Sequence, residues 1–337
     1  MINPKLLTGI LLIIYFLSGC ASSPALKSSS QNPGKKITFA KNENFVVLIT
    51  QKGDSLESLA EKHLGSKEKA WVIADFNDIS KIVPQREIVI PLKNFNPVQV
   101  YSDGYRTIPI LCYHRFGNSH TKLSVSEKKF RQQMQYLKDQ NFHVIHMRDV
   151  YEFIAGRKSL PKKSVVITID DGYRSTYEIA YPILQKFNFP ATLFLYTDFT
   201  GAGDAINWKQ GVEMYKSGLM DIQPHSKSHP NMSLRNENES HESYKKRIFR
   251  EVDEPSDKIR RKIGAPLHTF AYPYGDTNNM IIDHLVDKQY QLGVTVQPGS
   301  NPSFAHPYML RRTMIFGDHS IKDFEKALTV FKKMSLK

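Results

Sequence analysis

The chain has 337 residues and a formal net charge of +13, with 46 Lys and Arg against 33 Asp and Glu. The length suggests two domains or one large domain with an attachment. A hydrophobic content of 40% and a charged content of 23% indicate a globular protein and exclude an intrinsically disordered chain. Two cysteines exclude a disulfide framework and a four-cysteine zinc site, while the basic charge leaves nucleic acid, a membrane surface or an acidic polymer open as partners.

The first twenty residues predict a secretory signal that ends at a lipid-modified cysteine. Lys5 precedes a largely apolar run over 6–16, which suits a signal peptide and is shorter than the about 20 residues that span a bilayer. Leu17-Ser18-Gly19-Cys20 is similar to a bacterial lipobox, so we expect 1–19 to be removed and Cys20 to carry the lipid. The alternative is an ordinary signal peptide with an incidental cysteine. In both cases we expect the chain to lie outside the cytoplasm, which excludes nucleic acid as a partner. With the lipobox, we expect it to be anchored to a membrane of the cell envelope.

A flexible tether and a small unit are predicted next. Residues 20–44 are rich in Ser, Lys, Pro and Asn and lack an apolar period, which is typical of a tether. The following unit, 45–93, begins with a β-branched apolar run over 45–50. Helical spacing follows over 56–64 and 70–77, and an apolar run over 87–90 predicts a closing strand.

The unit 45–93 resembles a LysM module. The resemblance is carried by Gly53-Asp54-Ser55-Leu56, Leu59-Ala60, 73–77 and Ile88-Val89-Ile90-Pro91. It implies a strand–helix–helix–strand fold that binds N-acetylglucosamine-containing glycans such as peptidoglycan. A small packing domain without a ligand is the alternative.

Strands and helices alternate after a predicted linker over 94–107. Strands are expected over 108–113, 165–169, 191–196, 219–222, 268–271, 292–296 and 309–315, with helical stretches between most of them. Alternation of this kind predicts parallel βα units, and so many units in the remaining length favour a distorted (β/α) barrel over 108–337. The chain is therefore assigned to the α/β class, and catalytic residues are expected at the carboxyl ends of the strands.

Two aspartates follow one of these strands directly. Thr168-Ile169-Asp170-Asp171-Gly172 places both carboxylates after a buried run, where charges are costly without a partner. A metal ligand beside a general base would explain the pair. A helix N-cap would explain only one of them.

Two histidines follow another predicted strand. His225 and His229 are four residues apart, which would put them on one face of a helical turn and within reach of one ion. An Asp and two His leave coordination positions open, as in a catalytic metal site.

Together with Phe270-Ala271-Tyr272-Pro273-Tyr274-Gly275, these motifs resemble the NodB-homology polysaccharide deacetylases. The resemblance implies a distorted (β/α) barrel that removes acetyl groups from N-acetylated sugars with a divalent metal ion, often zinc. It implies that Asp170 is the general base and that Asp171, His225 and His229 bind the metal. It also implies that the backbone N–H of Tyr274 helps to hold the oxyanion.

The sequence departs from that family pattern at two places. The usual Leu-x-His near the C-terminus has no convincing match. Instead Cys112-Tyr113-His114 on the first strand resembles the permuted branch that includes poly-N-acetylglucosamine deacetylases, so His114 is the expected general acid. Ala271 replaces an arginine that orients the base in many relatives, and Arg312 is the candidate substitute.

The substrate and two rival functions stay open. Trp208, Tyr272 and Arg312 are the candidates for substrate contacts. The LysM resemblance favours peptidoglycan, and His114 favours a β-1,6-linked N-acetylglucosamine exopolysaccharide. A non-haem iron oxygenase would share the ligand types, but its His-x-Asp order is absent. An inactive glycan-binding lipoprotein of the envelope is the other alternative.

Overall fold

The structure is a computed structural model that describes residues 38–118 and 121–335. The predicted signal, Cys20 and the tether as far as residue 37 lie outside the described residues. Among the helices in the described ranges, none is long and apolar enough to cross a membrane.

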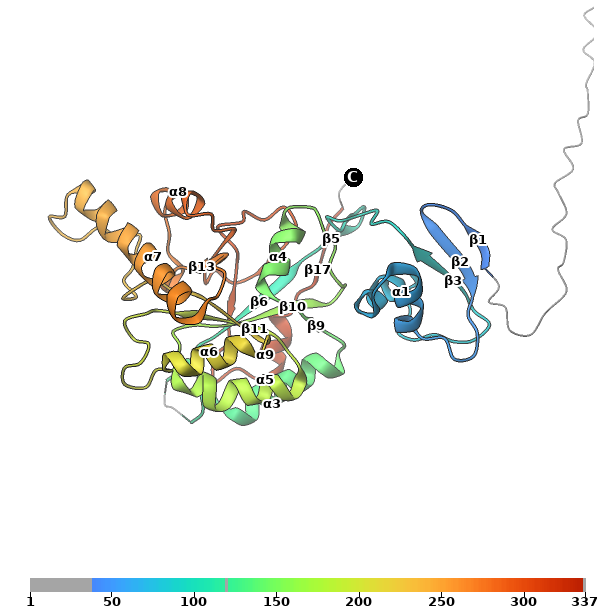
Figure 1. Cartoon of the computed structure of the whole chain (residues 1–337), viewed down its shortest axis with the longest axis horizontal. Helices are drawn as coiled ribbons and strands as arrows, with labels where there is room; N and C mark the ends of the chain where they lie inside the picture. Colours follow the sequence, from blue (N-terminus) through green and yellow to red (C-terminus); the bar gives the residue numbers. More distant parts are fainter. Residues whose placement is uncertain (1–37, 119–120, 336–337) are drawn as a thin grey trace, which may run out of the picture.

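An N-terminal unit pairs a small sheet with two helices (Figure 1). Its strands β1 (Thr38–Lys41), β2 (Phe45–Ile49) and β3 (Glu87–Pro91) are antiparallel in that order. Between β2 and β3 lie α1 (Leu56–Leu64), the 3-10 turn η1 (Lys67–Lys69) and α2 (Ala70–Asn77), so the predicted strand–helix–helix–strand pattern is present. The prediction of a tether over 20–44 is wrong for its last part, because β1 satisfies its backbone by pairing with the edge of β2.

Local signals explain these boundaries. Ser55 and Ser58 form a capping box at the start of α1, and Gly65 ends the helix in the left-handed region at φ 77°. The inward residues of the strands and helices form one small core of Val46, Leu48, Leu59, Ala60, Ile73, Ile88 and Ile90.

The predicted linker over 94–107 contains two short strands. β4 (Val100–Tyr101) pairs with β5 (Gly104–Arg106), and β5 pairs on its other side with β17 (Phe331–Lys333) from later in the chain. The linker is therefore partly ordered, because a segment more than 220 residues away supplies its backbone hydrogen bonds.

Seven parallel strands form a distorted barrel. They are β6 (Ile108–Tyr113), β10 (Ser164–Ile169), β11 (Ala191–Leu195), β12 (Met220–Pro224), β13 (Thr269–Ala271), β14 (Leu292–Val294) and β16 (Thr313–Met314). Backbone pairing runs β12-β11-β10-β6-β16, and a bridge from Val294 to Leu310 joins β14 to the segment before β16. The ladder is interrupted between β12 and β13. There the side-chain oxygen of Gln223 accepts from the N–H groups of His268 and Thr269.

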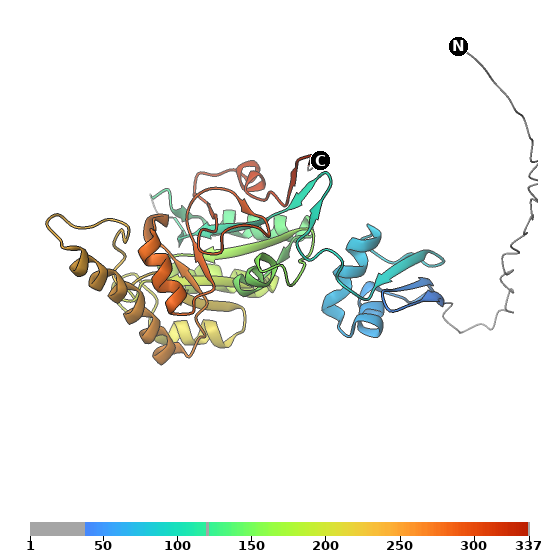
Figure 2. The same cartoon turned by 90° about the horizontal axis from the view of Figure 1, so that it is seen from above.

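Short strands and helices surround the barrel (Figures 1 and 2). The short strands are β7 (Arg115–Phe116), β8 (Ser124–Val125), β9 (His143–Val144) and β15 (Ser300–Asn301). The helices are α3 (Glu127–Asp139), α4 (Met147–Ile154), α5 (Tyr181–Phe187), α6 (Trp208–Lys216), α7 (His241–Ile263), α8 (Asn279–Asp287) and α9 (Ile321–Lys326). A π turn (Thr176–Ala180) precedes α5. A 3-10 turn (Pro273–Gly275) follows β13.

Strand β10 shows how the core positions the site. All six of its residues are buried, because helices cover one face and the barrel interior covers the other. Val165, Ile167 and Ile169 join the core beneath the helices, while Val166 joins the core inside the barrel. The parallel strands end at one edge of the barrel, where the residues that follow β6, β10 and β12 meet.

Candidate active site

The two carboxylates after β10 point into one pocket. The N–H of Asp170 donates to the carbonyl of Tyr113 at 2.8 Å, which continues the ladder between β10 and β6 by one residue. The backbone then reverses through Asp171 at φ 74° and Gly172 at φ 84°. A Cβ on Gly172 would lie 2.4 Å from Leu195 Cδ2, so glycine is required there. Asp170 and Asp171 are only 1% and 7% exposed.

Arg312 holds Asp170 through two parallel hydrogen bonds. Its Nη1 donates to Asp170 Oδ1 at 2.7 Å and its Nη2 donates to Oδ2 at 2.7 Å. The Nε of Arg312 donates to the carbonyl of Thr295 at 2.9 Å, so the buried guanidinium is fixed on both sides. Burial raises the pKa of Asp170, but the charge of Arg312 and its hydrogen bonds outweigh burial and hold that pKa well below its usual range. Arg312 therefore keeps Asp170 ionised and oriented, although Ala271 supplies no charge.

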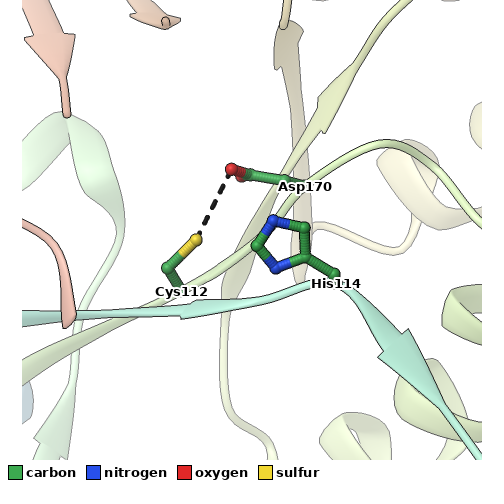
Figure 3. Close-up of side chains that lie close together, drawn as sticks. All are labelled: Cys112, His114 and Asp170. Carbon is green, nitrogen blue, oxygen red and sulfur yellow. Dashed lines mark hydrogen bonds between the residues drawn. The ribbon is translucent and has the colours of Figure 1, made fainter. Parts of the chain in front are cut away.

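Cys112 and His114 complete the surroundings of Asp170 (Figure 3). The thiol of Cys112 donates to Asp170 Oδ2 at 3.4 Å, a contact that the sequence does not predict, since Cys112 reads there as a small buried hydrophobe. His114 follows the end of β6, and one of its ring nitrogens lies within 4.8 Å of a carboxylate oxygen of Asp170. The Nδ1 of His114 is buried and has no hydrogen-bond partner among the described residues. Burial lowers the pKa of His114 below its usual value.

The two histidines after β12 converge through a loop. The prediction of a helical turn is wrong, because Ser226 at φ 70° and His229 at φ 61° bend the backbone through the left-handed region. The N–H of His229 donates to Ser226 Oγ at 2.9 Å and stabilises this bend. The Nε2 atoms of His225 and His229 are 3.2 Å apart, so the two imidazoles still face one point.

Glu251 on α7 holds the loop and is a residue that the sequence interpretation missed. Its carboxylate accepts from the N–H of Lys227 at 3.0 Å, the N–H of Ser228 at 2.8 Å and the Ser228 hydroxyl at 2.8 Å. Glu251 is 4% exposed and lies on the apolar stripe of α7, between Ile248 and Pro255. A carboxylate in the core stripe of an amphipathic helix is the signal that could have found it.

The carbonyl of Ala271, at the end of β13, orients His225. It lies 2.8 Å from His225 Nδ1, and because a carbonyl can only accept, Nδ1 must carry the hydrogen. The lone pair is therefore on Nε2, the nitrogen that faces Asp171 and His229.

Asp171, His225 and His229 form a triangle that fits a divalent metal ion. Asp171 Oδ1 is 3.7 Å from His225 Nε2 and 3.5 Å from His229 Nε2. Tetrahedral ligands at about 2.0–2.1 Å from zinc are about 3.3–3.4 Å from one another, close to all three separations. Asp171 Oδ1 is also buried without a hydrogen-bond partner among the described residues, as expected of an atom whose partner is an ion.

The pKa shifts in the triangle have the same cause. Burial, followed by the negative charge of Asp170, raises the pKa of Asp171 to about 7. Burial lowers the pKa of His225 to about 3, so its imidazole is neutral and able to donate a lone pair. A cation among the three ligands would relieve the repulsion between the two carboxylates.

The other predicted site residues differ in their exposure. Tyr274 is 61% exposed, has φ 61°, and its ring centroid lies 4.9 Å from that of His229, so it lies at the mouth of the site. Trp208 is half-buried at the start of α6 and packs on the core beneath the helices, so its contact with a substrate stays a prediction. The predictions that Tyr272 and Arg312 contact the substrate are wrong, because both side chains are fully buried. The hydroxyl of Tyr272 donates to the carbonyl of Tyr308 at 3.0 Å.

Comparisons with known proteins agree with this geometry. Residues 157–293 match the family described as polysaccharide deacetylase, a span that includes both aspartates and both histidines but neither His114 nor Arg312. A protein of Staphylococcus aureus (strain MRSA252) named poly-beta-1,6-N-acetyl-D-glucosamine N-deacetylase is 27% identical over 210 residues, which cover 60% of this chain and 72% of that protein.

Two solved structures are similar in fold. The Streptococcus pyogenes deacetylase PplD in complex with acetate has 26% sequence identity and a TM-score of 0.60, over 66% of this chain and 98% of that one. IcaB from Ammonifex degensii has 23% identity and a TM-score of 0.58, over 68% of this chain and 97% of that one. At its lower identity, IcaB supports the fold alone.

Proposed function

We propose that this enzyme, whose residues 157–293 match the polysaccharide deacetylase family, removes N-acetyl groups from an N-acetylglucosamine polysaccharide with the help of a divalent metal ion. One observation carries the proposal. The metal-ligand triangle of Asp171, His225 and His229 lies beside an ionised Asp170, whose Oδ2 is 3.8 Å from His225 Nε2.

Asp171, His225 and His229 would hold the metal ion, and zinc suits their two imidazoles and one carboxylate. When bound, such an ion lowers the pKa of a water molecule and polarises a carbonyl group. Glu251 fixes the loop between the two histidines, and the Ala271 carbonyl selects the tautomer of His225. The protein therefore presents three preformed ligand atoms and leaves further positions open for water and substrate.

Asp170 accepts the proton of the water that attacks the acetyl carbon. Because Arg312 lowers its pKa, Asp170 is ionised throughout the neutral range and is a weak base. A weak base can take a proton from water only if the pKa of that water is lowered. This requirement agrees with a metal site next to Asp170. The two hydrogen bonds from Arg312 also keep the carboxylate in one orientation as the proton moves.

The carbon–nitrogen bond breaks when the leaving amine gains a proton. His114 is the donor that the geometry supports, because its ring lies beside Asp170 at the end of the neighbouring strand. Burial lowers the pKa of His114, so at neutral pH it is uncharged before reaction. The proton that Asp170 takes from the attacking water passes to the nearby His114 and from there to the leaving amine, which returns both side chains to their starting protonation states. The backbone N–H of Tyr274, at the mouth, would assist in holding the oxyanion.

A β-1,6-linked N-acetylglucosamine polymer is our proposed substrate. The similarity to a protein named for that polymer supports it, as does the position of His114 directly after the first barrel strand. We further propose that residues 45–93 act as a LysM module and that Cys20 carries a lipid that holds the enzyme at the cell envelope. The Arg312–Asp170 pair argues against the inactive alternative, since it supplies the charge that Ala271 lacks.

Acetate release from two polymers tests the proposal. Metal-replete protein is incubated with poly-β-1,6-N-acetylglucosamine and, separately, with peptidoglycan, and Asp170→Asn is the matched control. We expect acetate from the first polymer and none from the control, which keeps its metal. Release from peptidoglycan alone would overturn the substrate, and release from neither polymer would overturn the function.

A further inference from the structure

A groove runs between the N-terminal unit and the barrel, away from the active site. Its main cavity has a volume of about 890 Å³, within the range of about 300–1,000 Å³ that is usual for ligand pockets. Residues of 64–76 and 91–106 form one part of its wall, and 158–162 and Phe331 form the other. A second cavity of about 360 Å³ shares Glu68, Trp71 and Lys158 with the first, so the two adjoin. We call them together the junction groove.

Direct contacts join the two walls of the junction groove. The N–H of Lys162, just before β10, donates to Asp75 Oδ2 on α2 at 2.9 Å. The ammonium of Lys162 lies 3.2 Å from Asp78 Oδ1 at the end of the same helix. The N-terminal unit lies beside the barrel in both views (Figures 1 and 2). The groove is thus formed by two parts of the chain that contact each other.

The junction groove is lined by aromatic rings that are unusually exposed to solvent. Phe76, Phe95 and Tyr101 are 49%, 53% and 40% exposed, although large apolar side chains normally avoid water. Trp71 lines both cavities, and Phe331 forms part of the barrel wall with the guanidinium of Arg106 4.9 Å above its ring. A concentration of exposed aromatic rings in a concave surface marks a binding site.

Polar groups between the rings indicate the chemistry of the ligand. The amides of Asn94, Asn96 and Gln99 lie in the lining. The Nε of Arg106 is buried without a hydrogen-bond partner among the described residues. Sugar rings combine apolar faces, which stack on aromatic rings, with hydroxyl and acetamido groups, which bond to amides and guanidinium groups. A protein partner would instead favour a flatter and more continuous apolar surface.

The charges of the junction groove favour an acetylated glycan over its product. Five basic and three acidic side chains line the main cavity: Lys69, Lys93, Arg106, Lys158 and Lys162 against Glu68, Asp75 and Asp103. An N-acetylated sugar is neutral, whereas deacetylation creates an amine that becomes cationic. The basic excess therefore disfavours the deacetylated polymer.

Strand β6 sets the separation between the junction groove and the active site. Arg106 lines the groove two residues before β6 begins, and His114 follows its end. The six residues of β6, at about 3.3 Å each, span about 20 Å and separate the two sites, which lie at opposite ends of the barrel. We propose that the junction groove binds a stretch of N-acetylated glycan chain remote from the reacting sugar and so holds the polymer on the enzyme. That the bound glycan is the same polymer as the substrate rests on the proposed function.

Fluorescence of Trp71 tests the binding directly. The chain has two tryptophans, so Trp208→Phe leaves Trp71 as the sole reporter, and Asp170→Asn prevents turnover. In this full-length double variant, we expect poly-β-1,6-N-acetylglucosamine to change the emission saturably, and its deacetylated form to bind more weakly. Adding Tyr101→Ala and Phe95→Ala should weaken binding about fivefold or more. Phe304→Ala, which removes an exposed ring outside the groove, should leave binding unchanged.

Co-sedimentation with insoluble polymer gives a second readout that keeps both tryptophans. The groove variants and Phe304→Ala are compared in the Asp170→Asn chain. Unaltered Trp71 emission on adding polymer, or groove variants that bind as well as Phe304→Ala, would overturn the proposal. Binding of polymer by the groove without acetate release from the wild-type chain would instead overturn the proposed function and leave the junction groove as a glycan site.

Discussion

Replacing Arg312 by methionine tests how the Asp170 carboxylate is held. Arg312 and Asp170 are 0% and 1% exposed and share two hydrogen bonds of 2.7 Å. Methionine keeps much of the volume but leaves the Asp170 carboxylate buried without its cation. Removing one partner of such a pair costs about 3–5 kcal/mol. For a domain of this size the melting temperature falls about 2–4 °C per kcal/mol, so we expect a loss of roughly 6–20 °C.

Thermal unfolding followed by circular dichroism at pH 7 measures this effect. Arg311→Met is the matched control, because the neighbouring Arg311 is exposed, and its melting temperature should change by no more than about 2 °C. The double variant Arg312→Met/Asp170→Leu should regain part of the stability, since no charge stays buried. Acetate release should fall about 10²-fold or more in Arg312→Met, because Asp170 loses the two hydrogen bonds that orient it.

Two results would refute this reasoning. Equal melting temperatures for Arg312→Met and Arg311→Met would mean that the pair carries no net stability. A double variant less stable than Arg312→Met would mean that the buried charge is not the cause of the loss.

Further substitutions address the proposed metal ligands, the loop that carries two of them and a polar pair in the core. His225→Ala should lose both bound metal, measured by elemental analysis, and acetate release; a metal-replete, active variant would refute the ligand assignment. Glu251→Gln should weaken zinc affinity about 10–100-fold in a competition titration, while Glu254→Gln, exposed on the same helix, should not. Asp221→Asn should lower the unfolding free energy by about 1–3 kcal/mol at pH 7, and the deficit should shrink below about pH 4 in denaturant titrations. Burial raises the pKa of Asp221, but the 2.7 Å contact with His268 outweighs it and lowers that pKa, so the stabilisation is lost as the carboxyl is protonated. A deficit that stays constant with pH would contradict this cause.

Much of the barrel follows from short apolar runs. The run over 108–113 coincides with β6, and the runs over 165–169 and 191–196 differ from β10 and β11 by one residue at one end. These strands are buried on both faces, so their composition alone identifies them. The aspartate pair could be located for the same reason, because it interrupts a buried strand with charge.

The details of the site depend on contacts between distant segments. The loop 225–229 is not helical because Glu251, more than 20 residues away, binds the N–H groups of Lys227 and Ser228. Local spacing contains no information about that partner. The sequence indicated Arg312 as a substitute for the missing arginine. It did not indicate that Arg312 is buried away from the substrate, because that burial depends on the packing of β16 against β6.

The orientation of Tyr272 could not be predicted from its place in the motif. It directly precedes Pro273 and Tyr274, yet its ring turns inward and its hydroxyl bonds to Tyr308. Gly293 permits this packing, because a Cβ there would lie 2.2 Å from the Tyr272 hydroxyl. A small residue far away in the sequence thus lets Tyr272 face the core, while Tyr274 lies at the mouth of the site.

The dependence of acetate release on bound metal shows whether the enzyme needs a metal ion at its site. The wild-type chain is stripped with a chelator, zinc is returned in steps, and acetate release from poly-β-1,6-N-acetylglucosamine is measured against bound metal. We expect negligible release from the stripped protein and a rise that ends at about one ion per chain, held by the triangle of Asp171, His225 and His229. Full release from metal-free protein would contradict this expectation.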